Sequence, residues 1–228
     1  MDSSHYPLGD RFRGYLPVVV DIETAGFNAR KNPILEIAAV IVEPESQGLL
    51  AITEKHHCNV TPFKGAELDA AALKFTGIDP YHPFRMAIDE KDALDKLFAP
   101  IRAALKRNLC KRAILVGHNP AFDVNFLNAA IERTQHKRSP FHPFSSFDTA
   151  TLGGLMFGQT VLSKIAEAAG LSWDSDKAHS ALYDAEQTAY LFCLMINRWK
   201  ILSETAVAQP NGVFPLIGDD LPPPDDQS

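Results

Sequence analysis

The sequence is poor in cysteine and has no long apolar stretch. It holds 3 cysteines among 228 residues, and Cys58, Cys110 and Cys193 lie far apart without a CxxC pair. This spacing predicts neither a disulfide framework nor a zinc site, so we expect reduced thiols. No apolar run is long enough to cross a bilayer, and the first residues lack the basic and then apolar layout of a secretory signal. The resulting expectation is a cytoplasmic protein without a membrane partner.

Basic charge is also in deficit. The formal net charge is -6, which by itself argues against a nucleic-acid partner. However, residues 202–228 hold five acids and no Lys or Arg, so the rest of the chain is nearly neutral and can carry local basic patches. The basic residues gather in three groups: Arg11 and Arg13; Lys106, Arg107, Lys111 and Arg112; and Arg133, His136, Lys137 and Arg138.

Length and composition favour one folded domain. A chain of 228 residues with 46% hydrophobic and 22% charged residues is ordinary for a soluble α/β domain. We expect residues 1–16 to form an N-terminal arm and residues 17–202 to form the domain. Residues 203–228 are acidic and rich in proline, which predicts a mobile tail.

Hydrophobic periodicity predicts alternating strands and helices. The first three strands follow one another with short turns, which indicates an antiparallel meander. Pro100 should interrupt or kink the helix that contains it. The predicted strands are 17–23, 34–42, 49–60, 112–118 and a short one ending at 148, and the predicted helices are 68–75, 89–106, 120–133, 149–157, 161–169 and 180–200.

The first strand ends in two acids. It reads P-V-V-V-D-I-E, and Asp21 and Glu23 point to the same side because strand side chains alternate. Two carboxylates this close repel each other unless a cation lies between them, and a hard divalent cation is the natural partner. A strand that runs out into a solvated loop is the simpler alternative for this pair taken alone.

Three more residues stand at comparable ends of predicted elements. Asp123 falls in the first turn of a helix, where the helix dipole favours an anion, and His179 precedes the helix that opens with Asp184. Singly, these residues are equally explained as a helix-start acid, a surface or cap histidine and a solvated acid. Together, four carboxylates and one histidine suit magnesium or manganese rather than zinc. Two such ions could clamp an in-line displacement at phosphorus while a neutral histidine takes the proton of a water.

The motifs around these residues resemble those of a known family. D-I-E-T at 21–24, H-N-P-A-F-D at 118–123 and H-S-A-L-Y-D-A-E-Q-T at 179–188 are similar to the three motifs of the DEDDh 3′-to-5′ exonucleases. D-R-F-R-G at 10–14, P-F-H-P-F at 140–144 and G-Q-T-V-L-S-K at 158–164 resemble the ribonuclease T branch of that family. The resemblance covers roughly residues 10–200.

That resemblance implies a fold, a chemistry and partners. The fold is an RNase H-like α/β domain with a mixed five-stranded sheet and helices on both faces. Asp21, Glu23, Asp123 and Asp184 would bind two Mg²⁺ ions, with Mn²⁺ as a substitute, and His179 would be the general base. The implied activity is metal-dependent release of 5′-mononucleotides from single-stranded 3′ ends of tRNA, rRNA and other stable RNAs, and of DNA, by a homodimer.

The resemblance also assigns substrate-binding residues. Phe27, Phe75, Phe122 and Phe144 would stack on the terminal bases, although core packing is the ordinary explanation for any one phenylalanine. A basic surface would bind phosphates for the active site of the partner subunit, and solvated surface charge is its alternative. One departure concerns Ala70 to Ala72, where the closest family pattern carries an acid that affects base discrimination. The basic surface comprises Arg11, Arg13, Lys106, Arg112 and Lys137.

Two alternative functions remain open from the sequence. The first keeps the chemistry but changes the role, to a DEDDh proofreading subunit or an oligoribonuclease-like enzyme. The P-F-H-P-F loop and the arginine-flanked arm argue against it. The second is a catalytically silent module that binds nucleic acid or protein, and it is disfavoured because all five catalytic positions are filled.

Overall fold

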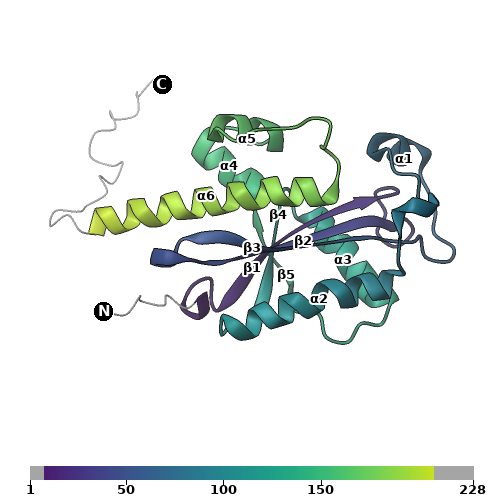
Figure 1. Ribbon diagram of the computed structural model, residues 1–228, viewed down its shortest axis with the longest axis horizontal. Helices are drawn as coiled ribbons and strands as arrows, with labels where there is room; N and C mark the ends of the chain where they lie inside the picture. The colour runs from purple at the N-terminus through teal and green to yellow at the C-terminus, as the bar shows by residue number, and fades with distance from the viewer. Residues whose placement is uncertain (1–7, 208–228) are drawn as a thin grey trace, which may run out of the picture.

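Five strands form one mixed sheet in the order β3-β2-β1-β4-β5 (Figure 1). The computed structural model describes residues 8–207. The first three strands pair antiparallel, as the meander prediction required, and β4 and β5 continue the sheet parallel to β1. The strands are β1 (Tyr15–Thr24), β2 (Ile34–Pro44), β3 (Leu50–Asn59), β4 (Arg112–Gly117) and β5 (Phe141–Asp148).

The central strand β1 is covered on both faces. Val18, Val19 and Val20 are buried, which is why a run of β-branched residues without polar alternation suits this position. β1 pairs with β2 on one side and with β4 on the other. Because β1, β4 and β5 are parallel, their carboxyl ends meet at one edge of the sheet, where open α/β sheets place their ligands.

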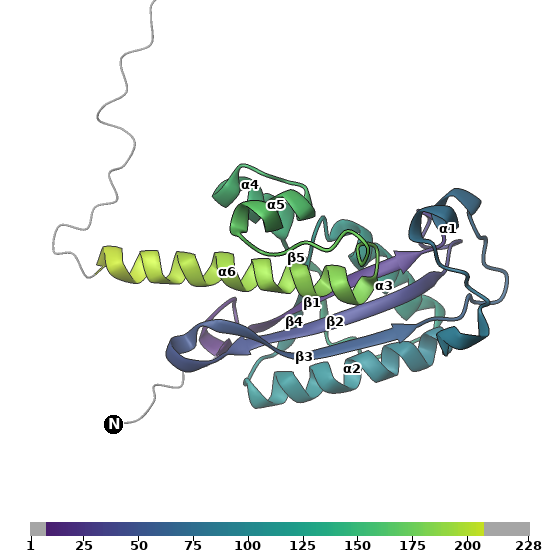
Figure 2. The same cartoon turned by 45° about the horizontal axis from the view of Figure 1, so that its top comes forward.

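Helices cover both faces of the sheet, which confirms the predicted fold class. The longest one, α6, packs along one face together with α4 and α5, whereas α2 and α3 lie on the opposite face (Figures 1 and 2). The short α1 lies beyond the end of β1 (Figure 2). The helices are α1 (Ala70–Thr76), α2 (Glu90–Arg107), α3 (Ala121–Arg133), α4 (Thr149–Phe157), α5 (Leu162–Ala169) and α6 (Ala181–Val207).

Most element ends lie within two residues of the sequence predictions, and three features deserve comment. β1 begins at Tyr15, inside the predicted arm, because Tyr15 pairs with Arg112 of β4. Pro100 lies within α2 but does not end it, since the apolar face of α2 around Pro100 is buried in the core. α6 continues to Val207 rather than ending at residue 200, so 203–207 are helical. The rest of the predicted tail, 208–228, and residues 1–7 of the arm lie outside the described residues.

Two further observations concern the described chain. No helix within residues 8–207 is both long and apolar enough to cross a membrane. Cys58, Cys110 and Cys193 are free thiols, and burial raises the pKa of each, as expected for inert thiols in a core.

Candidate active site

The carboxyl end of β1 carries the first two acids of the site. Asp21 and Glu23 flank the buried Ile22 and therefore share the opposite side of the strand. Burial, followed by the charge of Asp184, raises the pKa of Glu23 to about 8. Burial and the charge of Asp123 raise the pKa of Asp21 well above its ordinary value. Both shifts result from burial first and then from the negative charge of neighbouring acids.

Asp123 reaches the same place from the first turn of α3. Its side chain is 5% exposed, and burial raises its pKa to about 8 although the backbone of Ile22 hydrogen-bonds to it. Gly117 at the end of β4 allows the close approach of Pro120, because a Cβ at Gly117 would lie only 3.1 Å from Pro120 Cβ, and Asp123 Oδ2 is in ordinary contact distance of the same point at 3.4 Å. The tight turn from β4 into α3 thus aims Asp123 at the end of β1.

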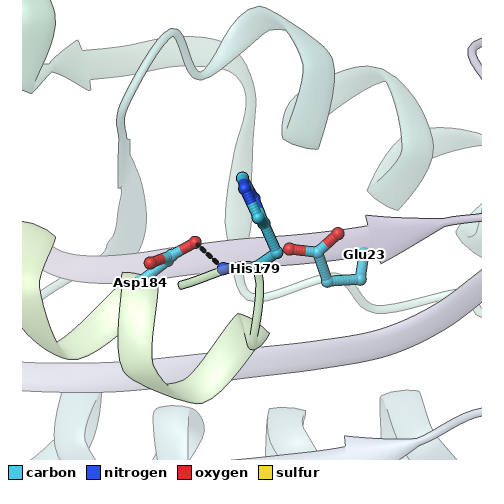
Figure 3. Close-up of side chains that lie close together, drawn as sticks. All are labelled: Glu23, His179 and Asp184. Carbon is cyan, nitrogen blue, oxygen red and sulfur yellow. Dashed lines mark hydrogen bonds between the residues drawn. The ribbon is translucent and has the colours of Figure 1, made fainter. Parts of the chain in front are cut away.

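His179 and Asp184 come from the start of α6. The backbone N–H of His179 donates to Asp184 Oδ2 over 3.0 Å, and His179 has a left-handed φ of 67°. As predicted, His179 therefore precedes the helix while Asp184 lies in its opening turn. The exposed His179 ring contacts the ring of Phe75 at 4.4 Å between centroids. Figure 3 shows the carboxylates of Glu23 and Asp184 on either side of His179.

These residues fit divalent cations. Glu23, His179 and Asp184 each offer a ligand atom within 4.8 Å of the others. Asp184 Oδ1 is buried without a hydrogen-bond partner, and burial raises the pKa of Asp184. A buried acceptor without a donor is costly, and an oxygen-rich, thiol-free set is the kind that Mg²⁺ or Mn²⁺ prefers.

An apolar cavity of about 350 Å³ opens beside the carboxylates. Its walls include Glu23, Phe27, Phe75 and Phe122, with Phe27 and Phe75 being 86% and 68% exposed. The rings of Phe27 and Phe122 lie 6.2 Å apart in an edge-to-face arrangement. Ala71 and Ala72, in the segment that departs from the family pattern, also line it. Exposed rings facing a cavity are unusual for a core and are suited to stacking on a planar ligand.

The loop that presents Phe27 is fixed by short hydrogen bonds. Thr24 Oγ1 donates to Gly26 O over 2.6 Å, and Asn32 bridges the Asn28 N–H and the Glu67 carbonyl at 2.8 Å each. Gly26 has φ 146°, and a Cβ there would lie 2.5 Å from Asn32 Cγ. Only glycine therefore fits this turn, which holds the loop against the segment leading into α1.

The structure does not bring all predicted substrate residues together. Phe144 lies on β5, 78% exposed, and is not among the residues that line the cavity. Arg13 contacts the ring of Tyr15 at the amino end of β1. Since Glu23 is eight residues beyond Tyr15 along β1, Tyr15 and Glu23 are roughly 25 Å apart. Most of the predicted basic surface belongs to that remote end, namely Arg11, Arg13, Lys106 and Arg112, while Lys137 lies in the connection between α3 and β5.

One acid beside the site did not emerge from the sequence. Glu36 of β2 is paired with Glu23 in register, and its charge contributes to the raised pKa of both Asp21 and Glu23. Its Oε2 accepts the Ala181 N–H over 3.4 Å and lies 3.5 Å from His57 Nε2. The available signal was a single acid inside the apolar run I-L-E-I-A-A-V.

Comparisons with known proteins place this geometry in a family. A family model described as exonuclease matches residues 18–192. Among solved structures, E. coli exonuclease I in complex with a dT13 oligonucleotide gives a TM-score of 0.62 at 17% identity, covering 85% of this chain and 43% of that one. A 3′-exonuclease that recognises the histone mRNA stem-loop gives 0.62 at 19%, covering 80% and 64%.

A third structure is matched over nearly its whole length. The nuclease domain of 3′hExo, a DEDDh family member bound to rAMP, gives a TM-score of 0.61 at 19% identity, covering 86% of this chain and 95% of that chain. The present chain thus spans less than two thirds of the first two relatives and corresponds to the nuclease domain of the third. Because the family match spans most of the sequence and includes every acid of the site, the chain belongs to the exonuclease family.

Proposed function

We propose that the protein is a metal-dependent 3′-to-5′ exoribonuclease of the ribonuclease T type, which trims single-stranded 3′ ends of tRNA, rRNA and other stable RNAs and also digests DNA 3′ ends. The observation that carries this proposal is the juxtaposition of four uncompensated carboxylates with a ring-walled cavity. Its volume of about 350 Å³ falls within the range of roughly 300–1,000 Å³ of small-ligand sites and suits the base of one terminal nucleotide.

The chain's own residues have distinct roles in this proposal. Asp21, Glu23, Asp123 and Asp184 would hold two Mg²⁺ ions, or Mn²⁺ in their place. When bound, such ions polarise a phosphoryl oxygen and make a water more acidic. A ring nitrogen of His179 accepts the proton of the attacking water. The backbone hydrogen bond from His179 to Asp184 keeps that ring beside the carboxylates.

The cavity defines which bond is cut. Phe27 and Phe75 grip the base of the last nucleotide by stacking, which tolerates every base because every base has a π-face. Glu23 lines the same cavity, so the phosphate on the 5′ side of that nucleotide lies beside the carboxylates, where cations bound by them would hold it. Hydrolysis there releases one 5′-mononucleotide and leaves a new 3′ end.

The remote basic residues support a homodimer. At roughly 25 Å along the strand from Glu23, Arg13 and its neighbours are too far away to contact the terminal phosphate of their own subunit. In a homodimer, they would bind the body of an RNA whose 3′ end lies in the other subunit. Sedimentation equilibrium of wild-type protein tests the dimer directly, and a monomeric mass would contradict it.

A trimming assay tests the activity. Purified protein with Mg²⁺ is incubated with 5′-labelled single-stranded RNA, a tRNA with extra 3′ nucleotides, a dinucleotide and a mismatched DNA primer. We expect a ladder shortening from the 3′ end, with the tRNA preferred over the dinucleotide and the primer. Preference for the dinucleotide or primer would favour the oligoribonuclease-like or proofreading role. Absence of any shortening would overturn the proposal and favour a silent binding module.

A further inference from the structure

We infer that a second cavity, between the loop after β1 and the exposed face of α3, binds an unpaired base upstream of the 3′-terminal nucleotide. This inference rests on the proposed function, because it extends the same nucleic-acid strand beyond the cavity that takes the terminal base. We call it the α3 cavity. Its lining consists of Phe27, Asn28, Ala29, Arg30, Asn125, Asn128, Ala129 and Glu132.

The position of the α3 cavity points to the next part of the strand. It has a volume of about 520 Å³, and Phe27 belongs to its lining as well as to that of the terminal cavity. The exposed Phe27 is therefore a shared wall of two adjacent cavities. A strand whose last base enters the terminal cavity passes this ring, which separates that base from its upstream neighbour and leaves the neighbour unstacked.

The chemistry of the lining suits a base edge better than a phosphate. Arg30, Asn125 and Glu132 are exposed, and within residues 8–207 none of these three side chains has a hydrogen bond or ion pair. Asn128 uses Nδ2 on the Pro143 carbonyl at 3.0 Å, which leaves its Oδ1 as an acceptor. Amide, guanidinium and carboxylate groups together match the donors and acceptors of unpaired bases, whereas Glu132 repels a phosphate.

Hydrogen bonds at Ala29 and Asn128 fix the loop and α3 on the two sides of the α3 cavity. The carbonyl of Ala29 accepts Arg133 Nη1 at 3.2 Å, and Arg133 is itself fixed by Glu90 at 2.7 Å. The Asn128 bond to Pro143 ties α3 to β5 beside the exposed Phe144. A preformed cavity loses little entropy when a base enters it, and Phe144 offers a platform for the strand as it leaves.

Binding of substrates with missing bases tests the inference. Labelled single-stranded RNAs carry an abasic nucleotide at the second, third or fourth position from the 3′ end, and their affinity is measured by fluorescence anisotropy in EDTA, where nothing is cleaved. We expect one of these positions to lower wild-type affinity by roughly tenfold, the scale of one base contact. Arg30→Ala and Asn125→Ala should weaken binding of intact RNA but not of RNA abasic at that position.

Matched controls and contrary outcomes make the test decisive. Lys91→Ala removes an exposed cation on α2, and Gln159→Ala removes an exposed amide after α4; both should bind like wild type. If all abasic positions bind equally, or if Arg30→Ala and Asn125→Ala weaken intact and abasic RNA by the same factor, the inference is wrong. Failure of the proposed function looks different: wild-type protein would bind RNA in EDTA with this pattern yet trim nothing after Mg²⁺ is added.

Discussion

Two buried acids at opposite ends of the sheet, Glu43 on β2 and Asp123 on α3, have opposite surroundings. Glu43, near the end of β2, accepts hydrogen bonds from Arg107 at 2.6 and 2.7 Å, from Thr53 at 2.5 Å and from Asn108. Burial alone would raise its pKa, but these donors outweigh burial and lower the pKa. Asp123, at the opposite end of the sheet, is equally buried, and its pKa is raised to about 8.

This difference in pKa distinguishes an acid that stabilises the fold from acids of a candidate functional site. Glu43 has its counter-charge within the chain, so its ionised form is part of the folded state. Asp123 and its neighbours have no such partner among the described residues, and under the proposed function cations from solution would compensate their charge. Buried acids without a counter-charge lower the stability of the fold, and neutral residues in their place would raise it. Acids of this kind therefore mark a candidate functional site.

The largest expected effect comes from removing one uncompensated acid. Asp21→Asn should lower the trimming rate by roughly a thousandfold or more, because the variant holds cations poorly. Metal-free protein should melt at a higher temperature than wild type, since one repelling charge is gone. Initial rates with Mg²⁺ and thermal unfolding in EDTA measure the two changes. The control is Asp92→Asn on the exposed surface of α2, and an active Asp21→Asn protein would contradict the mechanism.

Removing the counter-charge of Glu43 should lower stability and leave the trimming rate unchanged, the reverse of the effects expected for Asp21→Asn. Arg107→Met leaves Glu43 with Thr53 and Asn108 only, and should lower the free energy of unfolding by about 1–3 kcal/mol, less than for a fully buried pair because Arg107 is partly exposed. Urea unfolding measures this loss. The trimming rate below the unfolding transition should match wild type, and a large rate change would break the distinction between the two ends.

A smaller effect is expected at the terminal cavity. Phe27→Ala should raise KM for single-stranded RNA by roughly tenfold through loss of one stacked ring, with little change in stability because the side chain is 86% exposed. Leu155→Ala, which truncates an exposed apolar residue on α4, provides the control. Equal KM values for the two variants would show that Phe27 does not contact the strand.

The last expected effect concerns metal-free stability alone and is a pH dependence of opposite sign at the two ends of the sheet. Glu23 and Asp123 have folded pKa values of about 8 against ordinary values of 4.5 and 3.8. The folded state therefore binds more protons, and metal-free stability should fall as pH rises from about 4.5 through 8. The lowered pKa of Glu43 adds stability that is lost as pH falls through the acidic range. The melting temperature in EDTA, plotted against pH, should decline less above pH 5 for Asp123→Asn than for wild type, whereas Glu43→Gln should keep the full decline. Saturating Mg²⁺ should remove this decline in wild type.

Sequence patterns predicted most of the fold because its signals are local. Three consecutive valines suffice to identify β1 as a central strand, and Asp184 falls in the first turn of α6 as its motif indicated. The extension of α6 to Val207 was missed because helices were predicted from apolar stripes. In this last part of α6, Lys200 hydrogen-bonds to Glu204 and Ser203 donates to the Lys200 carbonyl.

The site was less predictable where it depends on chain paths. Pairing of Glu36 with Glu23 follows from the register of β2, which the sequence does not display. The separation of Phe144 from the other rings depends on where β5 lies in the sheet. The shared wall at Phe27 depends on Asn32 reaching Glu67, 35 residues further along the chain.

The acids of the site come from three layers of the molecule: β1 in the sheet, α6 on one face and α3 on the other (Figure 2). Cations held by all four carboxylates would tie helices from opposite faces of the sheet to the same end of β1. The catalytic centre therefore cannot be moved to another scaffold as a loop or a hairpin. Loosening of either helix would separate these acids even while the sheet stays folded.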